Sequence, residues 1–236
     1  MKEQSEEQLK RLLFSASPLE DETFYGYILR LAEMNEITDV RWIYRTICGE
    51  KIYAFDYGDN FYRKIGLRRL SELSDVDRQK LEKLHFEFPG SSFKKLVDKS
   101  QSFGQPHWEK FVKTEFPKIC PACLAENKYC RKMWELSFIT TCPHHNYLLI
   151  DSCQNCEARI KWARPSVSSC RCGFDFRDSN LTKVSEKEMK ISTYFHREFN
   201  LSCCAEKIVF SSQIDKLNAY LLLKFLCFIC SHIYGR

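Results

Sequence analysis

Glycine is scarce in this chain of 236 residues, with only eight copies. No phosphate-binding loop G-x-x-x-x-G-K-[ST], nucleophile elbow G-x-S-x-G or dinucleotide fingerprint G-x-G-x-x-G occurs in the sequence. This disfavours enzymes that hold their ligands on glycine-rich loops. Long apolar runs are also missing: the longest, 219–230, contains Lys224 and is shorter than the roughly 20 residues that a membrane span needs. Because the opening MKEQSEEQLKRLLFSASP lacks the apolar core of a secretory signal, we expect a soluble intracellular protein without membrane contact.

Cysteine, in contrast, is abundant, with thirteen copies. In a chain without a secretory signal, metal ligands or buried thiols explain them better than disulfides. The formal net charge is +5, but two zinc ions bound by seven thiolates would reduce it to about +2. Affinity for nucleic acid would therefore have to come from local basic patches.

The first cysteine pattern combines Cys120-Pro-Ala-Cys123 with Cys142-Pro-His-His145. Two ligands separated by two residues sit on one tight turn, and two such turns close a four-coordinate zinc site. Only His145 repeats the two-residue gap, so it is preferred over His144, which we expect to be a neighbouring or surface residue. The spacing predicts a closed zinc site without an open position for water.

The second cysteine pattern follows at once, with Cys153-Gln-Asn-Cys156 and then Cys170-Arg-Cys172-Gly173. Gly173 allows the left-handed turn that a tight knuckle often requires. The sequence thus predicts two zinc ions in total. The full set of predicted ligands is Cys120, Cys123, Cys142, His145, Cys153, Cys156, Cys170 and Cys172.

Four of the six remaining cysteines have no partner at ligand spacing. We interpret Cys48, Cys130, Cys203 and Cys204 as buried thiols. Cys227 and Cys230 with His232 could form half of a third site, but they lie in an apolar stretch in which positions i and i+3 share one helix face. Core packing is the preferred interpretation of this pair.

The rest of the chain predicts mainly helix. Asp21 can cap a helix that ends at Asn35, and Thr38 or Asp39 can cap a second one that stops at Gly49, together a helix-turn-helix-like unit. Ser74 with Asp77 suggests a capping box for a helix reaching about His85. The fold class is mainly α with small zinc-ribbon modules. Its predicted parts are an N-terminal extension (1–16), a helical domain (17–106), zinc ribbon 1 (107–150), zinc ribbon 2 (151–178) and a C-terminal helical region (179–236).

Basic residues accompany aromatic ones around the predicted ribbons. Basic side chains suit phosphates, while aromatic rings can stack on bases or anchor in a protein pocket, although charged residues on ribbons are often only a solvated face. The acidic Glu33, Glu36 and Asp39 argue against a major-groove role of the helix pair, for which a protein contact is as good an explanation. The candidate nucleic-acid or partner contacts are Arg63, Lys64, Arg68, Arg69, Lys128, Arg131, Lys132, Arg159, Lys161, Arg164 and Arg171.

An enzymatic alternative is a zinc-dependent nucleobase deaminase. His85-Phe-Glu87 followed by Cys120-x2-Cys123 imitates the H-x-E and P-C-x-x-C signature. However, Ile119 replaces the proline, and the other predicted zinc ligands would have no purpose. His85 also suits the C-terminal end of the helix before it. We therefore expect no catalytic residues.

The helix and cysteine motifs together resemble those of the TniQ/TnsD family. The similar segments are Pro18-Leu-Glu-Asp-Glu-Thr-Phe-Tyr-Gly-Tyr-Ile-Leu-Arg-Leu-Ala-Glu-Met-Asn35 and the core formed by Cys120-Pro-x-Cys123-Leu124, Arg131, Trp134, Cys142-Pro-x-His145, Leu148 and Cys153-x2-Cys156. The resemblance covers residues 18 to about 176. It implies that the eight ligands named above form the two zinc sites of the family.

The resemblance implies a non-catalytic adaptor in DNA transposition, located in the bacterial cytoplasm and associated with the nucleoid. Such a protein links a target-recognising element to the AAA+ ATPase regulator of the transposase. That element is a CRISPR effector complex with its guide RNA in some members and target DNA itself in others. The short stretch after Cys172 favours the short, adaptor-type TniQ. The resemblance leaves open whether the protein forms a homodimer. The alternative is a stand-alone zinc-ribbon DNA-binding regulator.

Overall fold

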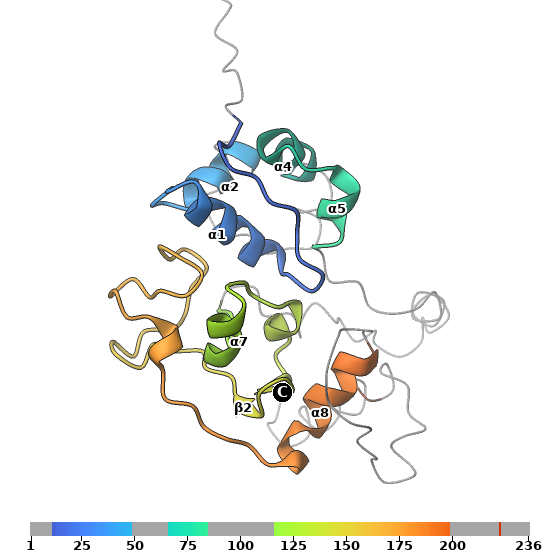
Figure 1. Ribbon diagram of the computed structural model, residues 1–236, viewed down its shortest axis with the longest axis vertical. Helices are drawn as coiled ribbons and strands as arrows, with labels where there is room; N and C mark the ends of the chain where they lie inside the picture. Colours follow the sequence, from blue (N-terminus) through green and yellow to red (C-terminus); the bar gives the residue numbers. More distant parts are fainter. Residues whose placement is uncertain (1–10, 49–65, 85–115, 199–221, 223–236) are drawn as a thin grey trace, which may run out of the picture. The chain divides into compact units, whose positions relative to one another are not determined.

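The computed structural model describes residues 11–48, 66–84, 116–198 and Leu222 (Figure 1). In these ranges the protein is mainly helical, as the sequence predicts, and its one sheet has two short strands. None of the helices described is long and apolar enough to cross a bilayer. The chain forms two compact units. The first consists of Met1–Phe86, Lys113–Glu135 and Leu149–Leu181, and the second of Glu87–Val112, Leu136–Leu148 and Thr182–Arg236.

In the first unit, the cap of α1 (Phe24–Met34) lies two residues after the predicted one. The Thr23 hydroxyl, not Asp21, accepts a hydrogen bond from the N–H of Gly26 at 3.2 Å. Asp21 was the wrong choice because its carboxylate is occupied by the side chains of Tyr129 and Arg131. The prediction that α1 ends at Asn35 is confirmed.

The second helix, α2 (Arg41–Cys48), follows a short turn. The Asp39 carboxylate accepts a hydrogen bond from the N–H of Arg41 at 3.0 Å, the capping contact expected for this residue. Glu36 has a left-handed backbone with φ of 55°, which reverses the chain between α1 and α2. The predicted stop at Gly49 lies outside the described residues.

The predicted helix from Ser74 to His85 is wrong in its start. Ser74 is the last residue of α4 (Leu67–Ser74), and its hydroxyl donates to the carbonyl of Leu70. Asp75 then takes a left-handed conformation, which ends α4. The next helix, α5 (Arg78–Glu82), begins at Asp77, whose side chain accepts from the N–H of Gln79. His85 lies beyond the described residues.

The core of the first unit is made by apolar residues at helical spacing. α2 packs against α4, and α4 against α5 (Figure 1). The fully buried side chains include Tyr27, Ile28, Leu29, Leu31, Ile43, Ile47, Leu70, Leu73 and Leu81. The segment before α1 is tied to these helices by hydrogen bonds, from Leu12 N–H to the Leu73 carbonyl and between Phe14 and the Asn35 side chain.

Helix α1 also packs on the cysteine-rich part of the first unit. The Tyr25 ring stacks on the buried Trp162 ring, with centroids 5.3 Å apart. The N–H of Thr23 donates to the carbonyl of Cys130 at 2.9 Å. A Cβ placed on Gly26 would meet the Cβ of Cys130 at only 2.7 Å. Glycine at this position therefore permits the close approach of α1 and the chain around Cys130.

We expect Gly26→Ala to destabilise the protein by about 1–3 kcal/mol, even though alanine is the better helix former. The added methyl group would overlap Cys130, which is fully buried, so the backbone of one of the two segments would have to shift. Gly66→Ala is the matched control, because a Cβ there meets only the Ile47 side chain at 3.9 Å. Denaturant unfolding of both variants measures the effect. Equal stability of the two variants would contradict the prediction.

The second unit contains the strands β1 (Thr141–Cys142) and β2 (Tyr147–Leu148), which pair in antiparallel register, and α8 (Glu186–Glu198). The Thr141 hydroxyl donates to the Ser192 hydroxyl at 2.8 Å, and the Phe138 and Phe195 rings lie 4.5 Å apart. These contacts hold α8 against β1. Helix α8 lies within the helical region predicted for residues 179–236, of which 199–221 and 223–236 are outside the described residues.

Candidate metal centres

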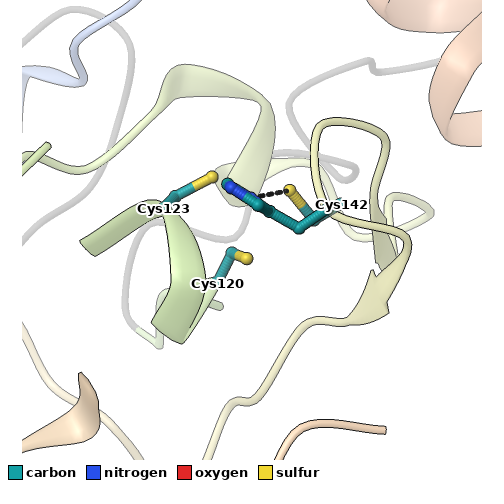
Figure 2. A group of neighbouring side chains, drawn as sticks. Cys120, Cys123 and Cys142 are labelled. Carbon is teal, nitrogen blue, oxygen red and sulfur yellow. Dashed lines mark hydrogen bonds between the residues drawn. The ribbon is translucent and has the colours of Figure 1, made fainter. Parts of the chain in front are cut away.

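Three sulfurs and one imidazole form the first candidate metal centre. Cys120 caps α7 (Pro121–Glu126), whose first residue is the helix-compatible Pro121, and Cys123 lies one turn further along. Cys142 ends β1, and His145 lies in the turn before β2. Figure 2 shows the sulfurs of Cys120, Cys123 and Cys142 directed toward a common point.

The distances in this cluster fit a tetrahedral metal ion. The four ligand atoms lie within 4.8 Å of one another, and the Cys142 Sγ to His145 Nδ1 distance is 3.6 Å. Zinc bonds of about 2.3 Å to sulfur and 2.0 Å to nitrogen at tetrahedral angles place the two donors about 3.6 Å apart. The His144 ring instead contacts the His196 ring, with centroids 5.5 Å apart. The structure thus brings His145, the residue preferred from its spacing, to the three sulfurs.

Four cysteines form the second candidate centre, in the first unit. Cys153 Sγ lies 3.7 Å from Cys172 Sγ, and Cys156 Sγ lies 3.8 Å from Cys170 Sγ. Two sulfurs on one tetrahedral zinc ion are about 3.8 Å apart, so these distances fit zinc as well. All four sulfurs lie within 4.8 Å of one another. The two clusters could therefore hold metal ions, and their donors suit zinc.

In three of the four pairs of candidate ligands, the residue after the second ligand has a left-handed backbone conformation. Asn146, Glu157 and Gly173 each follow the second ligand of their pair, with φ of 58°, 58° and 89°. Their N–H groups donate back to the carbonyls of Cys142, Cys153 and Cys170 at 2.8–3.0 Å. The left-handed turn predicted at Gly173 is confirmed. The pair on α7 differs, because its turn continues as a right-handed helix.

The two clusters differ in their exposure to solvent. In the first, the three cysteines are buried and His145 is half-buried, whereas in the second Cys156 and Cys172 are exposed. Burial raises the pKa of Cys170 to about 12, and the hydrogen bond from the backbone of Phe174 lowers the pKa of Cys172 to about 6. A bound zinc ion would hold these thiols as thiolates and contribute its binding energy to the fold.

Two of the candidate contact residues lie inside the first unit. Arg164 is 4% exposed and donates to the carbonyls of Lys161, Ser166 and Val167, and to Cys130 Sγ at 3.3 Å. The Arg131 side chain is 11% exposed and pairs with Asp21 at 2.7 Å. Both guanidinium groups are used within the fold, and neither is presented to an outside ligand.

The other described candidates lie nearer the surface, most of them with a partner. Lys128 pairs with Glu33, Lys132 donates to the carbonyl of Lys83, and Arg171 donates to the carbonyl of Ala163. Arg159 and Lys161 lie over the Phe116 ring, and Arg159 also pairs with Asp151. Arg68 and Arg69 are exposed on α4. Arg63 and Lys64, and the deaminase residues His85 and Glu87, lie outside the described residues.

The predictions for the remaining cysteines can be compared only in part. Cys130 is fully buried, as predicted, and Cys48 is half-buried. The other four, Cys203, Cys204, Cys227 and Cys230, lie outside the described residues together with His232.

Glu135 is a buried carboxyl group that no sequence pattern predicts. It ends the short helix η3 (Lys132–Glu135) and is 7% exposed, and its Oε1 has no hydrogen-bond partner among the described residues. Burial raises its pKa from 4.5 to about 7, while Thr23 and Lys132 act in the opposite direction. The burial of Glu135 depends on residues that are distant in the sequence. The local sequence Trp134-Glu135 therefore does not predict it.

Glu135 should make the protein less stable as the pH rises. The pKa of Glu135 is higher in the folded than in the unfolded state. Between pH 4.5 and about 7 the carboxyl group is therefore protonated in the folded state and ionised in the unfolded state. Relative to Glu135→Gln, the wild type should lose about 1 kcal/mol of unfolding free energy between pH 6 and 8. Urea unfolding at both pH values measures this difference. A constant difference between the two proteins would refute the prediction.

One comparison with known proteins identifies the family. The family model of TniQ matches residues 13–149, more than half of the chain, and this range includes α1, α2 and all four residues of the first cluster. No curated protein matches the sequence. TniQ proteins are generally non-catalytic and have an adaptor role associated with transposition. The chain therefore belongs to the TniQ family, as the resemblance of its motifs predicts.

Proposed function

We propose that this protein is a non-catalytic adaptor that links a target-recognising element to the AAA+ ATPase regulator of a transposase. The observation that carries the proposal is the TniQ match over residues 13–149. The matched region includes the buried packing contact between α1 and the chain around Cys130. A rigid arrangement of this kind suits a protein that must hold two partners in fixed positions.

In this proposal the two clusters bind one structural zinc ion each. The ligands are Cys120, Cys123, Cys142 and His145 at one site and Cys153, Cys156, Cys170 and Cys172 at the other. Four protein ligands complete each tetrahedron, so no position is left for a reacting water molecule. The metal ions then serve to stabilise two ribbon-like modules beside a helix-turn-helix-like pair, α1 and α2.

The partners that we propose follow from the family. They are the AAA+ ATPase, a CRISPR effector complex with its guide RNA, and target DNA. Exposed basic residues of both the helical part and the ribbons would supply the phosphate contacts. A bacterial cytoplasmic location at the nucleoid follows from these partners.

The test is reconstitution with purified partners. The protein is mixed with the proposed AAA+ ATPase and with the proposed effector complex, and the complexes are separated by size-exclusion chromatography with mass determination. We expect about two zinc ions per chain, co-elution with at least one partner, and a mass that gives the number of adaptor copies. Absence of zinc together with failure to bind either partner would refute the proposal. Sequence-selective DNA binding without any protein partner would instead support a stand-alone regulator.

A further inference from the structure

The two candidate metal centres differ in how far a reagent from solution can reach their sulfur atoms. At the first centre all three cysteines are buried. At the second, Cys156 and Cys172 are exposed, while Cys153 and Cys170 are buried. Because oxidation of cysteine follows the exposure of the sulfur, a small oxidant meets two sulfurs of the second cluster and none of the first.

Each exposed sulfur lies beside a buried one. The Sγ atoms of Cys172 and Cys153 are 3.7 Å apart, and those of Cys156 and Cys170 are 3.8 Å apart. To reach the disulfide bond length of about 2.05 Å, each sulfur would have to move by less than about 1 Å. An accessible thiol next to a second thiol that can resolve its oxidation is the arrangement of redox-sensitive cysteines.

One of the exposed sulfurs accepts a hydrogen bond from a neighbouring side chain. The Asn155 amide group donates to Cys172 Sγ at 3.6 Å. A hydrogen bond to a thiolate stabilises its negative charge and so lowers its nucleophilicity toward an oxidant. Asn155 should therefore slow the oxidation of Cys172 without covering it.

The other sulfur pair closes a loop that packs on α1. Residues 157–169 lie between Cys156 and Cys170 and belong to the same unit as α1. The Trp162 ring of this loop stacks on the Tyr25 ring of α1. A disulfide between the two cysteines would hold the ends of the loop together, as a metal ion would, so oxidation of this pair should preserve the packing on α1.

We propose that the second cluster is a site of reversible thiol oxidation, at which hydrogen peroxide oxidises Cys156 and Cys172 first. The Cys172 thiolate attacks a peroxide oxygen: an S–O bond forms, the O–O bond breaks, and the hydroxide released takes up a proton. The Cys153 thiolate then attacks the sulfur of the sulfenic acid, so that an S–S bond forms, the S–O bond breaks and a second water is released. Two thiolates thus give two electrons to one peroxide, with two protons from solvent. Cys156 and Cys170 react in the same way.

Two disulfides leave this cluster without a thiolate to hold zinc. The inference therefore rests on the zinc binding proposed for the second cluster, but not on the partners proposed for the adaptor. The buried cysteines of the first cluster should keep their ion under the same conditions.

The test follows zinc release from the full chain. Protein that contains both zinc ions is treated with hydrogen peroxide beside a chromophoric chelator, and with the chelator alone. We expect peroxide to release one ion per chain, with the second at least about tenfold slower, and the chelator alone to release neither. Peptide mass spectrometry should then find the disulfides Cys153–Cys172 and Cys156–Cys170. Near-UV circular dichroism should stay close to that of the reduced protein, and a dithiol with added zinc should restore the ion.

Two neighbouring variants test the hydrogen bond to Cys172. Asn155→Ala should lose its ion about threefold faster in peroxide, as expected for the loss of one hydrogen bond. Gln154→Ala is the matched control, because the Gln154 side chain bonds to the backbone of Asn180 instead of a sulfur. Equal rates for the two variants would refute the role of Asn155.

The oxidation site itself can fail separately from the metal sites. Release of both ions at one rate, release by the chelator alone, or a disulfide that includes a cysteine of the first cluster after loss of one ion would each overturn the inference. A protein that keeps both ions in peroxide would also overturn it and leave the proposed zinc sites intact. A protein purified without zinc would refute those sites, and the inference with them.

Discussion

Serine in place of Cys123 is expected to remove one of the two proposed zinc ions and to unfold the chain around the first cluster. The Cys123 side chain is buried, and its sulfur is one of four ligand atoms within 4.8 Å of one another. Zinc binding in such modules contributes on the order of 10 kcal/mol or more to folding. This is comparable with the whole stability of a typical domain, about 5–15 kcal/mol. Zinc content per chain and circular dichroism on heating measure the effect.

Cys130→Ser is the matched control for this experiment. Cys130 is as deeply buried as Cys123, but it accepts a hydrogen bond from Arg164 and belongs to neither cluster. Serine can accept the same hydrogen bond, so this variant should keep both zinc ions. A Cys123→Ser protein with full zinc content and unchanged melting, or a Cys130→Ser protein that loses an ion, would show that the ligand assignment is wrong.

Removal of the Glu22 carboxylate should be the most damaging change in the helical part, with an expected cost of about 3–5 kcal/mol. The Glu22 side chain is fully buried and binds Arg30 through both oxygens at 2.7 Å. It also accepts a hydrogen bond from the N–H of Leu19. Glu22→Ala would leave a guanidinium group that is only 15% exposed without its counter-ion. Urea unfolding of the purified protein gives the loss directly.

Glu72→Ala is the corresponding surface change. Glu72 pairs with Arg68 at 3.0 Å on α4, and both side chains are well exposed, so the expected cost is below about 1 kcal/mol. If Glu22→Ala cost no more than Glu72→Ala, the buried ion pair would not contribute to stability as proposed.

The members of the two candidate clusters could be predicted from the sequence because the geometry within each pair is local. Two cysteine or histidine residues separated by one or two residues meet on one turn whatever surrounds them, and Gly173 marks such a turn after Cys170 and Cys172. Asp21 and Arg131 show the opposite case. Nothing in the sequence near either residue indicates that they form an ion pair, so Asp21 was assigned to a helix cap and Arg131 to a surface contact. Their roles depend on tertiary contacts between distant segments.

The family motif has a structural explanation that the sequence alone did not provide. In the segment Asp21-Glu-Thr-Phe-Tyr-Gly26, the first residue binds Arg131, the second binds Arg30 and the third caps α1. The glycine makes room for Cys130. Most of this motif therefore joins α1 to the cysteine-rich part of the chain. Few of its side chains remain for contact with a partner.

The stacking of Tyr25 on Trp162 has a consequence for how the protein is made. The two rings are separated by more than half of the chain, so α1 leaves the ribosome long before the surface that buries it. At about 5–20 residues per second, that delay lasts on the order of ten seconds. During this time the Tyr25 ring lacks its stacking partner, and truncation before Trp162 would make that loss permanent.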